Sequence, residues 1–217
     1  KITPMVVVMI EIIDNAIQLC VTMGCGLWAG IYAFRHKSQL FFLLACFYGT
    51  FWLGLIYWLL DLVLNGYTPR FFYVSDLSWI AGFLFLLLLN FFIVQPGERG
   101  YRPIFAFLVV VVLLLMTWHL CFFGNDINTL IWCLLLTGCG YLSTRGLLFA
   151  RHHGALKPRL QYIHIVILFV VFTEFILWIS SCHFKGSTLA NPYFWCDFLL
   201  TAGLFALMPA MLKAVDS

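Results

Sequence analysis

Long apolar runs, separated by short polar or turn-forming segments, follow one another along the whole chain. Each run has about twenty residues or more, the length that an α-helix needs to cross the hydrocarbon core of a bilayer. Backbone groups inside lipid must find their hydrogen-bond partners within the segment, so each run should be helical. The pattern predicts seven membrane-spanning helices, at 5–34, 39–64, 75–94, 102–123, 127–150, 160–183 and 192–212.

The composition supports an all-α, polytopic membrane protein. Hydrophobic residues make up 64% of the chain, charged residues make up 10%, and the mean hydropathy is +1.01. Seven spans leave no room for a soluble domain. We therefore expect residues 1–217 to form a single seven-helix transmembrane domain whose main partner is the lipid bilayer.

Basic residues mark one face of this bundle. The links after the first, third and fifth spans, and the segment after the last span, hold Arg35, Lys37, Arg99, Arg102, Arg151, Lys157, Arg159 and Lys213. The opposite links hold only Arg70 and Lys185, and Arg145 is expected to extend to the basic face. The positive-inside rule predicts an outside N-terminus and a cytoplasmic C-terminus in a multi-pass protein of the cell membrane. The net charge of +3 thus describes two opposed faces, and no nucleic-acid partner is expected.

Two stretches share a spacing of Trp, Gly and Asp. One reads FWLGLIYWLLDLVLNGYTPRFFYVSDLSWIAG, and the other reads VFTEFILWISSCHFKGSTLANPYFWCDFLLTAG. Trp58 and Trp178 each precede a Gly by eight residues, and Asp76 and Asp197 each precede an Ala-Gly pair by five. The spacing predicts a parallel duplication of three plus one plus three helices, with the fourth span as the linker between the triplets. A chance match is the alternative, because Gly, Trp and Phe are abundant here.

Acidic residues gather in the outer halves of the predicted spans. Seven of the nine acids are expected there, namely Glu11, Asp14, Asp61, Asp76, Asp126, Glu174 and Asp197. Charged groups in a membrane are costly and normally face the bundle interior or water. The positive-inside rule concerns Lys and Arg, so acids within the spans need a separate cause.

An outward-facing pocket lined by carboxyl groups and aromatic rings is our hypothesis for that cause. Carboxylates supply charge and aromatic faces attract cations, so we expect a small amine or another cation, or a proton shared among carboxyl groups. The alternatives are that some of these residues lie in the headgroup layer and that Asp76 only favours a helix start, after Ser75 as N-cap. The candidate ligand-binding residues are Glu11, Asp14, Asn15, Gln18, Trp58, Asp61, Asp76, Trp79, His119, Glu174, Trp178 and Asp197.

Glu174 is the acid least easily explained by the membrane interface, because it lies in the middle to outer half of the sixth span. An isolated carboxylate at that depth cannot remain charged without a partner. We expect Glu174 to be protonated when the pocket is empty, or ionised against a bound cation.

The segments LGLIYW and SDLSWIAGFLFLLLL, and the late segment DFLLTAGLFALMPA, resemble the seven-helix membrane region in front of bacterial diguanylate cyclases and some histidine kinases. The resemblance covers about residues 40–212 and implies a bacterial sensory input module, that is, a sensor or receptor. The chain ends in Lys-Ala-Val-Asp-Ser without an output domain. We therefore expect a shortened chain or a stand-alone relative, with a separate cytoplasmic output protein or a second copy of this chain as partner.

The expected arrangement of helices also resembles SWEET and PQ-loop transporters and the rhodopsins. A small-solute or proton-coupled transporter is therefore the alternative function. No Pro-Gln pair occurs in the first or fifth span, which weakens the PQ-loop assignment. Lys213 lies at the end of the last span rather than in its middle, which argues against a retinal-binding rhodopsin.

A membrane-embedded metal-dependent hydrolase is the third and least favoured function. His119, His183, Glu174 and Asp197 could form a zinc site near the outer surface, but no HxxxH, HExxH or GxSxG spacing supports catalysis. We expect no cofactor and no resident metal. The eight cysteines form no CxxC pair, although a disulfide between Cys182 and Cys196 is chemically permitted on the outer side.

The orientation gives a test by thiol labelling. Single cysteines placed beside Arg35, Arg99, Arg151 or Lys213, in a chain without its native cysteines, should resist a membrane-impermeant reagent added outside intact cells. Cysteines placed in the opposite links serve as positive controls. Strong labelling beside the basic residues would overturn the topology.

Overall fold

The structure is a computed structural model, which describes residues 4–66, 73–123, 127–152, 160–184 and 191–215. This part of the chain contains seven α-helices, each long and apolar enough to cross a membrane, so the predicted spans are confirmed as helices. A short 3-10 helix, η1 (Glu98–Gly100), lies in the link between the third and fourth helices. The α-helices are α1 (Pro4–His36), α2 (Gln39–Asn65), α3 (Tyr73–Ile93), α4 (Ile104–Phe123), α5 (Ile127–His152), α6 (Leu160–His183) and α7 (Pro192–Val215).

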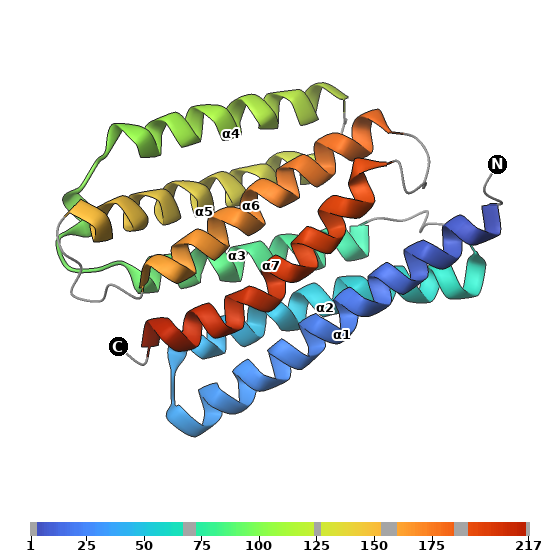
Figure 1. Ribbon diagram of the computed structural model, residues 1–217, viewed down its shortest axis with the longest axis horizontal. Coiled ribbons are helices and arrows are strands. Elements are labelled where there is room, and N and C mark those ends of the chain that lie inside the picture. Colours follow the sequence, from blue (N-terminus) through green and yellow to red (C-terminus); the bar gives the residue numbers. More distant parts are fainter. Residues whose placement is uncertain (1–3, 67–72, 124–126, 153–159, 185–190, 216–217) are drawn as a thin grey trace.

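Six of these helices form a closed ring. α1 packs against α2, α2 against α3, α3 against α5, α5 against α6 and α6 against α7, and α7 returns to α1. α4 lies outside the ring, where it packs against α5 and α6 (Figure 1). The two ends of the chain lie at opposite ends of the bundle (Figure 1). The six ring helices therefore enclose an interior that runs along the bundle from one end to the other, and α4 lies at the periphery.

Glycine and proline fix several helix ends. Gly66 adopts a left-handed conformation (φ 72°), and its N–H donates to the Leu62 carbonyl 3.0 Å away, which ends α2. Pro192 is the first residue of α7, where a missing N–H costs nothing. Ser75 was expected to be an N-cap, but α3 already begins at Tyr73, so that assignment is wrong.

Large side chains fill the middle of the ring. Phe41, Phe47, Tyr48 and Leu204 have no exposed surface. The Tyr48 hydroxyl donates a 2.6 Å hydrogen bond to the Leu204 carbonyl and so connects α2 to α7, which are not adjacent in the ring. Gly26 of α1 permits this packing, because a Cβ there would lie 3.0 Å from the Tyr48 Cβ. The interior is thus closed at mid-length.

A buried ion pair joins the link between α3 and α4 to α5. Arg145 is only 9% exposed and Glu98 is fully buried, with 3.2 Å between Arg145 Nε and Glu98 Oε1. The backbone N–H of Gln95 donates to the second oxygen of Glu98 at 3.0 Å. The expectation that Arg145 extends to the interface was therefore wrong, because Glu98 folds back and provides the countercharge inside the protein.

This ion pair should matter for stability. Glu98→Leu leaves a buried guanidinium without a countercharge and is expected to cost about 3–5 kcal/mol. Thermal unfolding in detergent micelles measures the loss. The double variant Glu98→Leu/Arg145→Met removes both charges and should recover part of it, and Arg102→Leu, at an exposed basic residue of the same link, is the control. An unchanged unfolding midpoint in Glu98→Leu would contradict this account.

Candidate functional site

A pocket of about 450 Å³ lies inside the ring, near the end where α1, α3, α5 and α7 begin. Each of the six ring helices contributes described residues to its wall, and α4, outside the ring, contributes Leu120. The volume falls within the range of small-molecule sites. The described residues that line it are Asn15, Gln18, Phe51, Leu55, Trp58, Asp76, Trp79, Ile80, Leu120, Asn128, Thr129, Trp132, Glu174, Leu177, Trp178, Ser181, Cys182, Tyr193, Asp197 and Leu200.

Eight of the twelve candidate ligand-binding residues line this one pocket. They come from α1, α2, α3, α6 and α7, which are far apart in the sequence but meet around the interior of the ring. These eight are Asn15, Gln18, Trp58, Asp76, Trp79, Glu174, Trp178 and Asp197.

The other four candidates lie near the pocket or at the same end of the bundle. Glu11 accepts a hydrogen bond from the Trp58 indole, and the Asp14 carboxyl faces that of Asp197. Asp61 is half-buried near the end of α2, where it accepts a hydrogen bond from the Asn65 amide. His119 of α4 contacts His183 of α6, with 2.8 Å between their Nε2 atoms.

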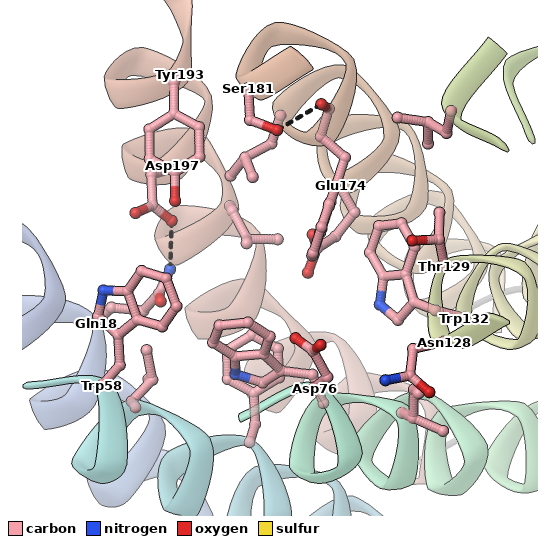
Figure 2. Close-up of a pocket in the computed structure, with 18 of the residues that line it drawn as sticks. Gln18, Trp58, Asp76, Asn128, Thr129, Trp132, Glu174, Ser181, Tyr193 and Asp197 are labelled. Atoms are coloured by element: carbon pink, nitrogen blue, oxygen red, sulfur yellow. Dashed lines mark hydrogen bonds between the residues drawn. The ribbon is translucent and has the colours of Figure 1, made fainter. Parts of the chain in front are cut away.

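Carboxyl groups enter the pocket from opposite sides. Glu174 of α6 and Asp76 of α3 point toward each other across the open space (Figure 2). Glu174 is 4% exposed, and the Trp178 indole, one turn further along α6, lies within hydrogen-bonding reach of its carboxyl group. Glu174 is thus buried inside the bundle, as the sequence predicted, and does not face lipid.

A polar network on α1 and α7 holds the third carboxyl group. The Gln18 amide donates to Asp197 Oδ1 at 2.9 Å (Figure 2). It also donates to the Thr201 hydroxyl at 3.1 Å. The Thr201 hydroxyl in turn donates to the backbone carbonyl of Asp197 at 3.0 Å. All three side chains are at least nine-tenths buried, so the network fixes one face of the pocket.

Tryptophan pairs form two further walls. The rings of Trp58 and Trp79, on α2 and α3, have centroids 5.9 Å apart, and those of Trp132 and Trp178, on α5 and α6, have centroids 5.0 Å apart. Gly54 makes room for the first pair, because a Cβ there would lie 2.8 Å from Trp79 Nε1. Within the described chain, Trp79 Nε1 has no hydrogen-bond partner. A ligand oxygen in the pocket would find a free donor there.

Sequence reasoning missed the part of the wall that α5 supplies. Asn128, Thr129 and Trp132 line the pocket, as does Tyr193 of α7. Their position near the outer ends of predicted spans was the available signal. They were overlooked because only the ring order shows that α5 faces the interior.

The described wall of the pocket carries no basic side chain. No Lys or Arg is among the described lining residues, and the only ion pair within the described ranges is Glu98–Arg145 at the other end of the bundle. Across the same ranges, no group of three or more His, Cys, Asp or Glu side chains is arranged to hold a metal ion. Cys182 and Cys196 are both free, so the permitted disulfide is not formed.

The fold and the site together define an all-helical protein with seven potential membrane spans and an acidic, tryptophan-rich pocket at one end. Comparison of the chain with protein-family models, with curated proteins and with solved structures finds no match. The resemblance to bacterial sensory regions therefore rests on the quoted sequence segments alone.

Proposed function

We propose that this chain is an integral membrane sensor or receptor whose outward-facing pocket binds a small organic cation, such as an amine. The charge of the pocket carries the proposal. Asp76, Glu174 and Asp197 enter it from three helices, and no Lys or Arg is among the described residues that line it. Glu174 and Asp197 are both buried. Carboxylates withdrawn from water in this way are costly unless they are compensated, and a cationic ligand compensates them.

The aromatic walls fit the same class of ligand. Trp58 and Trp79 lie on one side of the ring, and Trp132 and Trp178 lie on the α5–α6 side. A cation over an indole face gains about 0.5–2 kcal/mol, with the larger value in desolvated sites. The indole N–H of Trp79, which has no hydrogen-bond partner among the described residues, would donate to an oxygen on the ligand. The ligand class is therefore a compact ammonium compound with an acceptor group.

The orientation of the pocket follows from the basic residues. Arg35, Arg99, Arg151 and Lys213 all lie near the ends of helices or in a link at the bundle end opposite the pocket. The positive-inside rule assigns that end to the cytoplasm, which leaves the pocket outside. A receptor needs only to bind its ligand more tightly in one state of the bundle than in another, and the closed interior below the pocket suits that role.

The predicted duplication is part of this proposal, and two glycines support it. A Cβ at Gly82 of α3 would lie 3.4 Å from Thr50 Oγ1 of α2, and one at Gly203 of α7 would lie 3.0 Å from Val170 Cγ2 of α6. Thr50 and Val170 are equivalent, since each lies eight residues before the matched tryptophan. The order of helices around the ring also agrees with a repeat of α1–α3 as α5–α7. The last helix of the first triplet, α3, contacts α5, and the last helix of the second triplet, α7, contacts α1. A two-fold axis along the membrane normal would then run through the pocket.

Glu174 provides the test of ligand binding. An amine panel can be screened by thermal shift and titration calorimetry on the purified protein across a pH series. The affinity of an amine that binds should fall as the pH drops, because protons compete with it for the carboxylates. Glu174→Gln should weaken binding about tenfold or more and remove most of the pH dependence, as expected for one lost charge contact of at least 1.4 kcal/mol.

Asp61→Asn is the matched control, since Asp61 is an outer-end acid that does not line the pocket. Neutral alcohols of the same shape as the amines control for the ligand charge. If Glu174→Gln binds with the wild-type affinity and the wild-type pH response, the pocket is not an amine site.

A transporter is the second candidate, because a second pocket of about 270 Å³ lies at the other end of the bundle. Its wall comes from the starts of α2 and α6, the ends of α3 and α7 and the segment after α3. Along α2, Tyr48 lies between Leu40 of this pocket and Phe51 of the acidic pocket. Along α7, Leu204 lies between Leu200 and Met211 in the same way. Alternating access would require this barrier to open.

Proline in α7 is the feature that favours such movement. Pro209 has no N–H, so the carbonyl of Phe205 lacks its helical partner one residue after Leu204. Helices bend readily at such positions. The Tyr48–Leu204 contact thus lies next to a natural bending point.

Transport and sensing can be separated in proteoliposomes. We expect the reconstituted protein to bind a labelled amine without accumulating it inside the vesicles, because the Tyr48–Leu204 barrier is closed. Time-dependent uptake that Tyr48→Phe alters would establish a transporter instead. Tyr162→Phe, at an exposed tyrosine near the other end of the bundle, is the control.

A further inference from the structure

Two carboxyl groups face each other beside the acidic pocket. Asp14 of α1 and Asp197 of α7 lie within hydrogen-bonding reach of one another. Asp14 is 2% exposed and Asp197 is 6% exposed, so water does not screen the pair. An ionised carboxylate has only acceptor atoms, so two ionised carboxylates cannot bond to each other directly and need a proton, a cation or another donor between them.

The protein donors near this pair satisfy only one of its members. Asp197 Oδ1 receives the Gln18 amide at 2.9 Å. Asp14 Oδ1 is buried and has no hydrogen-bond partner in the part of the chain that the structure describes. A buried oxygen without a donor is costly, and it indicates that something absent from the protein chain itself occupies this position.

Among the described residues, those around the pair supply more negative charge rather than a countercharge. Glu11 of α1 and Glu174 of α6 both interact with Asp197, and Cys196 of α7 lies in its field. Tyr193 of α7 lies near all four carboxyl groups. α2 faces this region with the Trp58 indole, which donates to Glu11. The described neighbours on α1, α2, α6 and α7 therefore favour a positive occupant.

We propose that Asp14 and Asp197 form a second cation site, which holds a proton or a sodium ion between their carboxyl groups and is distinct from the pocket acid Glu174. Both occupants meet the same need, because each supplies the positive charge that joins two acceptors. Sodium would be bound by oxygen atoms, and the Asp14 and Asp197 carboxyl groups and the Thr201 hydroxyl offer oxygens in this region.

The site connects to the acidic pocket through one shared residue. Asp197 lines the pocket, whereas Asp14 is not among the lining residues. The occupant of the pair therefore sets the charge that Asp197 presents to a ligand, and ligand binding would change the occupancy of the pair in return. This coupling rests on the proposed function, but the cation site itself does not.

Infrared spectroscopy tests the proton with the pocket empty. Wild-type protein should show the C=O stretching band of a protonated carboxylic acid that disappears at alkaline pH. Asp14→Asn and Asp197→Asn should each remove the same component of that band. The introduced amide supplies the missing donor, so both variants should fold with an unfolding midpoint at or above the wild-type value and less dependent on pH.

Sodium is tested by thermal unfolding in sodium chloride against potassium chloride at equal ionic strength and alkaline pH. A sodium-occupied pair predicts a higher midpoint in sodium, and Asp14→Asn should abolish the difference. Asp61→Asn, an acid outside the cluster, should leave both readouts unchanged. Loss of the infrared component identifies a proton, and loss of the sodium shift identifies sodium.

The proposal is overturned if neither signal occurs in wild-type protein, or if both persist in Asp14→Asn and Asp197→Asn. Neither assay contains an amine. A failure of amine binding would therefore refute the proposed function and leave the cation site standing, and the reverse also holds.

Discussion

Charge that is withdrawn from water must be compensated, and the interior of this bundle depends on how that is achieved at each end. Because the outer surfaces of the helices are apolar along most of their length, polar side chains within them are expected to face the inside of the ring. At the basic end, Arg145 meets Glu98 within the protein, and the pair is complete. At the other end, Asp14, Glu174 and Asp197 gather without a Lys or Arg among the described lining residues. The first cluster is an ion pair completed within the fold, and the second is the basis for the proposed binding of a cation.

The two clusters also differ in what their neighbours do. Glu98 accepts a backbone N–H as well as the guanidinium, so its oxygens are satisfied by the fold itself. Gln18 donates to one oxygen of Asp197, and Oδ1 of Asp14 has no hydrogen-bond partner within the described residues. Buried polar groups are nearly always paired in folded proteins. An incompletely paired cluster beside a pocket of about 450 Å³ is therefore better explained by ligands than by packing.

Much of the fold could be predicted because lipid imposes a simple rule on the sequence. Spans of sufficient apolar length become helices, and the seven predicted ranges match the helices of the described chain within a few residues. The depth of Glu174 in its span could also be inferred. So could the shared face of Glu11, Asp14, Asn15 and Gln18 in α1, because residues at i, i+3, i+4 and i+7 lie on one side of a helix. The burial of Arg145 in an ion pair could not be inferred from the sequence. Its partner Glu98 lies 47 residues away, on a link whose path depends on tertiary packing.

The sequence by itself determined the elements and which residues carry the chemistry, because hydrophobic length and periodicity are local properties. Only the tertiary structure decided which faces meet. It closed α1 onto α7, which brings Asp14 against Asp197, and it placed α4 outside the ring. It also made Trp132 of α5 part of the pocket wall, and it placed His119 in contact with His183 instead of in that wall. These outcomes depend on the order of helices around the ring, and that order is set by long-range packing of nearly uniform apolar surfaces, which no local pattern encodes.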